Sequence, residues 1–219
     1  ADAECNTPLF VGSFRCSYET AVTINGVEVS TKTGAASADD SGNQQDAQLE
    51  LSAYPGVYTV NIARSDYLTA SPVVIRNGDK YTMQGALNVH ATRKLSTAIQ
   101  DAVRKKLDTC ATSTEANPKN CPFAFNDYSS FIFSSPDDYR NYAWSIASYP
   151  TVNNIDVGSK SFETSEGSAK VTYDEKSGDD WSPESDSDDF QVNGTFSIVN
   201  NQVKVTFSDE STGADSSGF

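Results

Sequence analysis

Histidine is nearly absent from this chain, since His90 is the only one among 219 residues. A Ser-His-Asp or Cys-His catalytic site would therefore have to be built on that single side chain. The sequence also lacks a G-x-S-x-G nucleophile motif and a glycine-rich phosphate-binding loop. We therefore predict that the protein is not an enzyme and has no catalytic residue. His90 precedes the expected helix and is assigned a structural role.

Basic residues are also scarce: the chain has 16 Lys and Arg against 30 Asp and Glu, a formal net charge of −14. Nucleic acids and anionic membrane surfaces are bound through Lys and Arg, so this composition argues against both as primary partners. No apolar run approaches the ~20 residues that a membrane-spanning helix needs. The chain opens with "ADAEC", without an initiator Met or a leader. We expect a mature or excised soluble portion, attached to a membrane only through an anchor outside this sequence.

The chain has four cysteines, namely Cys5, Cys16, Cys110 and Cys121. None forms a C-x-x-C motif, and the wide spacing within each local pair does not match the knuckles of a zinc site. An even number of cysteines, arranged as two local pairs that lie far apart in the sequence, favours two disulfides. Four cysteines allow three connectivities, and we favour Cys5–Cys16 with Cys110–Cys121 because closing a short loop costs least. Disulfides imply an oxidising compartment, so we expect an extracellular location at the cell surface.

Residues 1–87 alternate apolar and polar positions with a period of two, as strands do. Asn25-Gly26 stands between two such runs and predicts a hairpin, because both residues tolerate positive φ. Further turns are expected at Pro55-Gly56 and Asn77-Gly78. We predict a β-sandwich-like domain over residues 1–87.

Residues 91–109 change to a helical period. The apolar residues of this stretch fall on one face of an amphipathic helix: Leu95, Ile99, Ala102, Val103 and Leu107. Alternating segments follow, with turns or bulges expected at Asn193-Gly194 and Asn200-Asn201. The pattern predicts an α+β domain over residues 88–210, stapled by Cys110–Cys121, with the long helix across an antiparallel sheet. Residues 211–219 are expected to be a disordered tail.

Acidic residues are concentrated in residues 174–189. Clustered carboxylates could hold Ca²⁺, but the spacing does not match an EF-hand loop. The segment is better interpreted as a mobile acidic hairpin loop, so we predict no cofactor and no metal site, with Ca²⁺ as the alternative.

Two features could form a binding surface. The helix carries cations that include Arg104 and Lys105, and an aromatic stretch follows the second cysteine pair. The cations could equally be a solvated helix face, and the aromatic residues could equally pack in a core. The candidate binding residues are Arg104, Lys105, Phe125, Tyr128, Phe131 and Trp144.

The stretches "VTINGVEV" and "YPGVYTVNIA" resemble the small β-domains of bacterial envelope proteins. The helix with "LDTCATSTEANPKNCPF" and the following "YAWSIASYPTV" resemble the extracellular part of actinobacterial single-pass envelope proteins. In such proteins a small β-domain precedes a cone-shaped domain that looks like nuclear transport factor two, an arrangement similar to that of TcaA-type proteins. The resemblance covers roughly residues 20–210 and brings no catalytic residue with it.

These observations predict a non-enzymatic extracellular cell-envelope module, the ectodomain of a membrane-anchored sensor or assembly factor. Its partner would be an envelope polymer, a glycan or a surface protein. Two alternatives stay open. One is an adhesin or carbohydrate-binding module that uses the aromatic stretch near Trp144. The other is a glycan hydrolase that uses the acidic segment.

Overall fold

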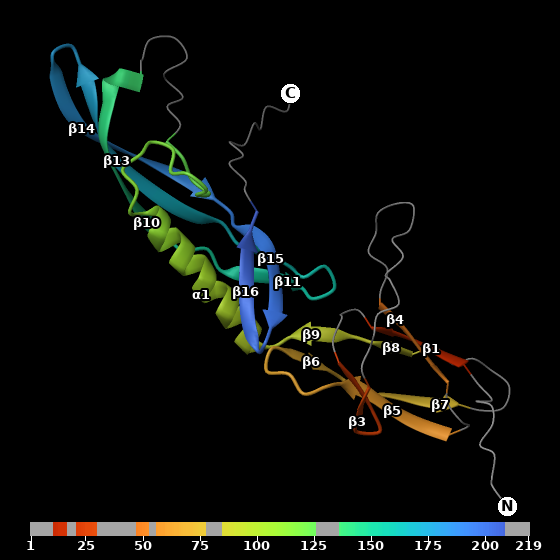
Figure 1. Cartoon of the computed structure of the whole chain (residues 1–219). Coiled ribbons are helices and arrows are strands. Elements are labelled where there is room, and N and C mark those ends of the chain that lie inside the picture. Colours follow the sequence, from red (N-terminus) through yellow and green to blue (C-terminus); the bar gives the residue numbers. More distant parts are fainter. Residues whose placement is uncertain are drawn as a thin grey trace, which may run out of the picture. The chain divides into compact units, whose positions relative to one another are not determined.

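The computed structural model describes residues 11–16, 21–29, 47–52, 56–77, 85–125 and 136–208. Within these ranges the chain is mainly β, with one α-helix and several antiparallel sheets, which confirms the predicted class in this general form. The backbone forms two compact units (Figure 1). Unit 1 comprises Ala1–Leu95 and Asp156–Lys160, and unit 2 comprises Ser96–Ile155 and Ser161–Phe219. The boundary expected after residue 87 stays a prediction, as does the tail, which lies outside the described residues.

Unit 1 is built from short strands in small sheets. The first sheet has the order β4 (Ala47–Ser52), β1 (Val11–Cys16) and β8 (Gly85–Leu87). The second has the order β3 (Val27–Val29), β2 (Val22–Ile24), β5 (Gly56–Ile62) and β7 (Val73–Asn77). The strands β6 (Leu68–Ala70) and β9 (Val89–Ala91) form a separate pair.

The predicted hairpin at Asn25-Gly26 is confirmed. Both residues have positive φ, 49° and 81°, which is the backbone of a tight hairpin turn between β2 and β3. Asn25 also donates its N–H to the Thr59 carbonyl and accepts the Thr59 N–H on its side-chain oxygen, both at 2.8 Å. The asparagine therefore extends the β2–β5 ladder by one more pair. The turns expected at Pro55-Gly56 and Asn77-Gly78 lie partly outside the described residues.

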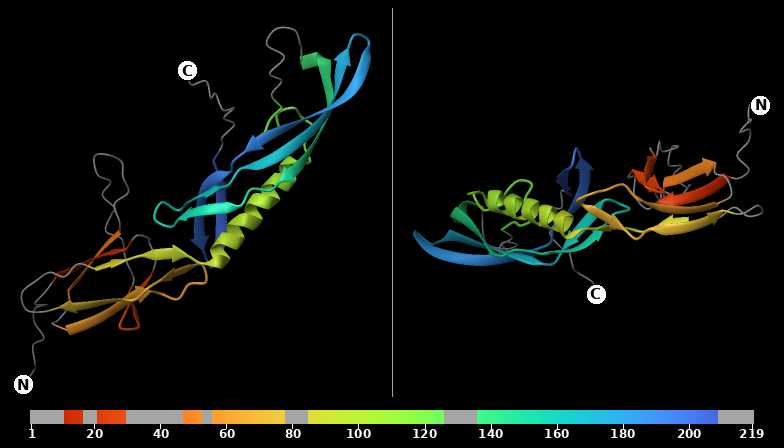
Figure 2. Two further views of the ribbon diagram at one scale, coloured as in Figure 1. Left: turned by 180° about the vertical axis from the view of Figure 1, so that it is seen from behind. Right: turned by 90° about the horizontal axis from the view of Figure 1, so that it is seen from below.

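Unit 2 contains most of α1 (Arg93–Cys110) and two sheets. Figures 1 and 2 show α1 lying along one face of the sheet with the order β10–β13–β14. The β13–β14 hairpin continues past the C-terminal end of the helix (Figures 1 and 2). The strands of this sheet are β10 (Tyr139–Ser148), β13 (Gly167–Ser177) and β14 (Asp180–Phe190), and a 3-10 turn, η2 (Pro136–Asp138), precedes them. The second sheet has the order β11 (Val152–Asp156), β12 (Ser161–Thr164), β15 (Asn193–Val199) and β16 (Gln202–Phe207).

The helix forms where the sequence predicts it, because its apolar residues recur every four positions. Leu95, Ile99, Val103 and Leu107 are all fully buried. Gln100 fixes the helix to the chain between β10 and β11. Its side chain donates to the Pro150 carbonyl and accepts from the Val152 N–H, both at 2.9 Å.

The predicted Cys110–Cys121 disulfide is confirmed, with the two Cα atoms 5.8 Å apart. It joins the last residue of α1 to the end of the following loop. That loop is held at two further points, because Phe125 donates its N–H to the Ala116 carbonyl and Trp144 donates its indole N–H to the Glu115 carbonyl, both at 2.9 Å. The predicted Cys5–Cys16 pair lies outside the residues whose side chains are described.

The interpretation of residues 174–189 as a loop is wrong. These residues form the distal part of β13 and nearly all of β14, which pair without a register shift from the Gly167–Phe190 pair to the Ser177–Asp180 pair. The turn needs only Gly178, at φ 66°, and Asp179. Long cross-strand pairing therefore overrides the low strand propensity of the acidic residues.

The two C-terminal turn predictions have opposite outcomes. Asn200 and Asn201, at φ 51° and 58°, form the predicted two-residue turn between β15 and β16. Gly194, in contrast, lies inside β15 and forms no turn. A Cβ atom at this position would lie 2.3 Å from the Thr206 carbonyl oxygen and 2.8 Å from the Phe162 ring, so glycine is required by close packing.

We predict that Gly194→Ala destabilises the protein by about 2 kcal/mol, because neither the neighbouring backbone nor the buried Phe162 ring can give way cheaply. The free energy of unfolding in urea measures the effect. Thr195→Ala, at the exposed neighbouring position, should change it by no more than about 0.5 kcal/mol. Equal effects of the two substitutions would contradict the packing argument.

We also predict that replacing Cys110 and Cys121 by Ser lowers stability by up to ~3 kcal/mol. The loop would lose its covalent closure, so the Phe125 N–H should exchange with solvent faster in the variant. Hydrogen-exchange mass spectrometry of the peptide that contains Phe125 measures this. Unchanged exchange would show that the two loop hydrogen bonds hold the segment without the disulfide.

Candidate functional site

Four aromatic side chains gather where the β10–β13–β14 sheet leaves the helix. Phe125 lies 4.6 Å from Tyr173, 5.4 Å from Tyr139 and 5.5 Å from Tyr142, measured between ring centroids. Tyr173 also lies 5.7 Å from Tyr139 and 6.1 Å from Tyr142. All four side chains are half-buried. We call these four residues the aromatic cluster.

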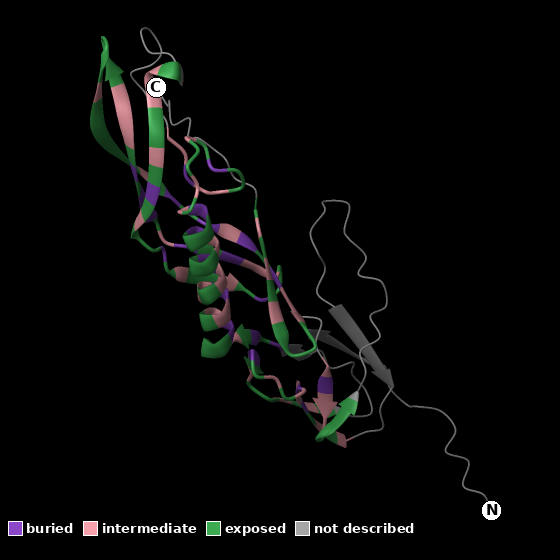
Figure 3. Ribbon diagram, turned by 60° about the vertical axis from the view of Figure 1, so that its left-hand side comes forward, coloured by how far each residue is buried: buried purple, intermediate pink, exposed green. Residues whose placement is uncertain are grey.

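The alternation of β13 explains why the cluster forms here. Ala169 and Val171 point to the core and are buried, and Tyr173 is the next residue on the same side of the strand. The helix ends before this point (Figure 1), and no residue of the segment 172–189 is buried (Figure 3). The helix does not cover the four rings of the aromatic cluster. They therefore stay partly exposed to solvent and do not form a fully buried core.

A β-bulge in β10 places polar groups beside the cluster. The register with β13 shifts between Arg140 and Ala143, and Asn141 has a positive φ of 61°. This conformation is uncommon for a residue other than glycine. It directs the Asn141 amide to the Asp174 carboxylate, to which it donates at 2.7 Å. Bulges that redirect a side chain are common next to functional sites.

Arg140 adds a second contact to the same carboxylate. Its Nε lies 3.5 Å from Asp174 Oδ2, and its guanidinium lies 3.8 Å from the centre of the Trp181 ring. Trp181, Arg140, Asp174 and Asn141 therefore form a connected row, which we call the polar network. Three strands contribute to it, and the Asp174 carboxylate is held by two side chains of β10.

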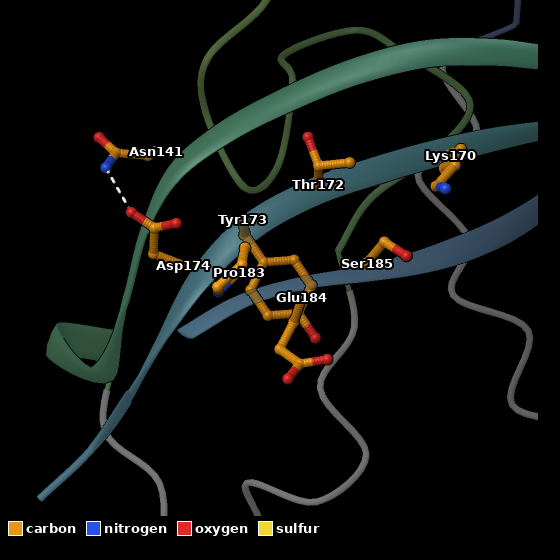
Figure 4. A pocket seen from close by; sticks show the side chains of 8 residues that line it. All are labelled: Asn141, Lys170, Thr172, Tyr173, Asp174, Pro183, Glu184 and Ser185. Atoms are coloured by element: carbon orange, nitrogen blue, oxygen red, sulfur yellow. Dashed lines mark hydrogen bonds between the residues drawn. The ribbon is translucent and has the colours of Figure 1, made fainter. Parts of the chain in front are cut away.

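A shallow hollow of about 350 Å³ opens beside the polar network. Polar residues from all three strands and Pro183 line it, and Figure 4 shows the Tyr173 and Glu184 side chains on the opposite side of the strands from Thr172 and Ser185. The lining residues are Asn141 on β10, residues 170 and 172–174 on β13, and residues 183–185 on β14. The Tyr173 ring lies on the other face of β13, with Ala169 and Val171, and belongs to the aromatic cluster.

Carboxylates dominate the electrostatics of this end of the sheet. Burial raises the pKa of the Tyr173 hydroxyl to about 12, and the charges of Asp186 and Glu175 add to the rise. Burial also raises the pKa of Asp188, although the Ala124 N–H that this carboxylate accepts acts in the opposite direction.

The structure brings only part of the predicted binding set to this site. Phe125 belongs to the aromatic cluster, whereas Trp144 is only 6% exposed and packs against Phe123 at 4.8 Å. A ring buried in this way cannot serve as a contact surface for a ligand. Tyr128 and Phe131 lie outside the described residues.

The predicted cations lie elsewhere. The Arg104 guanidinium stacks on the Tyr149 ring at 5.5 Å, and the Tyr149 hydroxyl donates to Asp108. The hydrogen bond to Asp108 also raises the pKa of Tyr149. Tyr149 follows the far end of β10, about 30 Å along the strand from Tyr139. Arg104 therefore lies near the end of β10 opposite to Tyr139, while the joint surface expected with Lys105, Tyr128 and Phe131 stays a prediction.

Sequence reasoning missed Tyr173, Asn141 and Lys170 as site residues. The alternation Ala169, Val171, Tyr173 could have placed Tyr173 on the face that carries the core. No comparable signal marks Asn141, because a bulge depends on the register between two strands.

Metal binding finds no support in the described part of the chain, where no three His, Cys, Asp or Glu side chains are grouped to hold an ion. The acidic residues of β14 are spread along an extended strand, which separates their carboxylates.

No protein-family model, curated protein or solved structure matches this chain.

We predict that one tyrosine titrates near pH 12 and that Tyr173→Phe removes this step. An acid whose pKa is raised on folding holds its proton more tightly in the folded state, so stability falls as the pH rises from 10 through about 12. Tyrosinate absorbance follows the titration, and Tyr58→Phe in unit 1 is the control. A folded wild-type protein whose tyrosines are all ionised by about pH 11 would contradict the assignment.

Proposed function

We propose that the chain is a non-enzymatic extracellular module of a cell envelope that binds a surface ligand or partner protein through the aromatic cluster. The observation that carries the proposal is the aromatic cluster itself: four packed rings at an end of the sheet where the helix does not cover them. Partly exposed tyrosines combine a large apolar surface with a polar group, a combination enriched at binding interfaces.

Two rings of β10 illustrate the difference between a core and a contact surface. Trp144 is buried under the stapled loop, with its N–H bonded to a carbonyl of that loop. Tyr142, two residues earlier and on the bulge, is half-buried within the aromatic cluster. Core packing accounts for Trp144, whereas the rings beyond the helix retain area for a partner.

The extracellular location is supported by the Cys110–Cys121 disulfide, since disulfides persist in oxidising compartments. In the part of the chain that the structure describes, no helix has the length and apolar character to cross a membrane. Attachment to a membrane would use an anchor outside this sequence, as the resemblance to actinobacterial envelope proteins of the TcaA type implies.

The same proposal includes the finer architecture. Residues 1–87 would form a β-sandwich-like domain, and residues 88–210 a stapled α+β domain with a cone-like sheet. The small sheets of unit 1 and the helix-covered sheet of unit 2 are compatible with this division. In this arrangement the second domain carries the aromatic cluster.

The test is retention of the purified protein on isolated actinobacterial cell walls. We predict that wild-type protein sediments with the walls and that Tyr142→Ala weakens retention about tenfold, because it removes an anchor ring of the aromatic cluster. Tyr149→Ala is the matched control, since it removes an exposed tyrosine at the other end of β10. Absence of retention, or equal loss in both variants, would refute the proposal.

A further inference from the structure

Resting on the proposed function, we infer that the aromatic cluster is the docking surface for an arginine-rich segment of a partner protein. Guanidinium groups of that segment stack on the rings and pair with carboxylates beside them. Three features support this assignment: the carboxylates that share a face with the rings, the position of the basic residues of the sheet, and the pairing of rings with cations elsewhere in the chain.

Carboxylates border the aromatic cluster on its own face of the sheet. Residues directly opposite each other in an antiparallel ladder have their side chains on one face, and Tyr173 lies opposite Glu184 (Figure 4). Asp186 follows Glu184 by two positions and therefore lies on the same face. Glu175 follows Tyr173 in the same way and lies opposite Tyr139, another ring of the cluster. We call Glu175, Glu184 and Asp186 the acidic row.

The charge of the acidic row acts on the rings. Burial raises the pKa of the Tyr173 hydroxyl to about 12, and the charges of Asp186, Glu175 and Glu184 raise it further. Within the described ranges, no carboxylate of the acidic row forms an ion pair with a Lys or Arg residue. Glu184 and Asp186 are also exposed, so both can pair with a cation that a partner supplies.

The basic residues of these three strands lie on the other face of the sheet. They are Arg140, Lys170 and Lys176. Lys170 and Lys176 occupy positions of β13 that alternate with Tyr173, and Arg140 belongs to the polar network on that face. The segment 126–135, between the loop and η2, contains no Lys or Arg. The face with the aromatic cluster therefore receives carboxylates from β13 and β14 but no basic residue from this sheet.

Elsewhere the chain joins an aromatic ring, a cation and a carboxylate in one contact. The Arg140 guanidinium lies 3.8 Å from the centre of the Trp181 ring, and its Nε lies 3.5 Å from Asp174 Oδ2. The Lys94 ammonium lies 5.1 Å from the centre of the Tyr67 ring and 2.6 Å from a neighbouring carboxylate. The aromatic cluster and the acidic row supply the ring and the carboxylate of such a contact, and the partner supplies the cation.

Arginine fits this surface better than lysine. A guanidinium is planar, so it stacks on a ring and donates two parallel hydrogen bonds to a carboxylate, whereas an ammonium is a compact point charge. Glu184 and Asp186 are two positions apart on one strand, a separation of about 7 Å. Alternate side chains of an extended peptide have the same spacing. A segment with several arginines can therefore contact both carboxylates at once.

The experiment titrates the full chain with hexaarginine, hexalysine and hexaglutamate at about 0.15 M salt, where exposed charges more than about 8 Å apart are largely screened from one another. Isothermal titration calorimetry measures Kd. We expect hexaarginine to bind with Kd below about 100 µM and hexalysine to bind about fivefold more weakly, because only the guanidinium stacks on the rings. Hexaglutamate should not bind, since the acidic row repels it.

Two pairs of variants place the binding on the aromatic cluster. Glu184→Gln should weaken hexaarginine binding about fivefold, whereas Glu166→Gln, the same change at an exposed position about 23 Å along the chain from Tyr173, should change it less than about twofold. Tyr142→Leu keeps an apolar side chain but removes the aromatic face, and should also weaken binding about fivefold. Tyr149→Leu, at the other end of β10, is its matched control and should have less than about a twofold effect.

Binding of hexaglutamate, or equal losses within both pairs of variants, would overturn the inference. So would equal binding of hexaarginine and hexalysine that Tyr142→Leu leaves unchanged, because charge alone would then attract the peptides.

Trypsin treatment of the isolated walls separates this inference from the proposed function. Trypsin cleaves proteins after Lys and Arg and leaves wall polymers intact, so we expect treated walls to lose their retention of the wild-type protein. Retention that survives trypsin and still falls in Tyr142→Ala overturns the arginine-rich partner and leaves the proposed function standing, with a wall polymer or glycan as the ligand. Absence of retention on untreated walls overturns both.

Discussion

The path of the chain after α1 depends on the covalent link between Cys110 and Cys121. The link holds the end of the helix next to the end of the loop, so that Phe123 enters the core against Trp144 at 4.8 Å and Phe190 at 5.4 Å. Two residues later, Phe125 reaches the outer rings of the aromatic cluster. A short loop without this closure would have to hold the same geometry against its own conformational entropy. The same constrained segment thus supplies Phe123 to the core and Phe125 to the aromatic cluster.

The site itself follows from a mismatch of lengths. The β13–β14 hairpin is longer than the part of the sheet that α1 covers (Figure 2), so the apolar face of β13 runs on into solvent. The chain fills that uncovered face with tyrosines, which tolerate partial exposure better than aliphatic side chains do. On the neighbouring strand, the bulge at Asn141 turns an amide toward Asp174. The same length of strand thus supplies apolar rings and an ordered carboxylate.

The sequence is informative where a feature depends on neighbouring residues. The helix was predictable from the four-residue spacing of Leu95 to Leu107, and two hairpins from asparagines that accept positive φ. Strand β14 was not predictable, because its Asp, Glu and Pro residues are poor strand formers and their pairing depends on distant β13. The turn or bulge expected at Asn193-Gly194 was wrong for a related reason. Gly194 is needed because it packs against Phe162, which lies more than thirty positions earlier in the sequence. The hollow could not be predicted from local sequence patterns, because residues of three strands line it.

Strand β14 forms the outer edge of its sheet, and its composition has a consequence for the protein at high concentration. The ladder to β13 continues unbroken through Pro183, so the missing N–H belongs to the outer edge. Ser187, four residues on, presents its N–H to the same edge and donates it to the Asp186 carboxylate at 2.7 Å. Two of the positions at which another strand could add are thus closed, and the surrounding carboxylates repel a second copy. At high concentration this edge of the sheet is therefore protected against pairing with the same edge of a second copy.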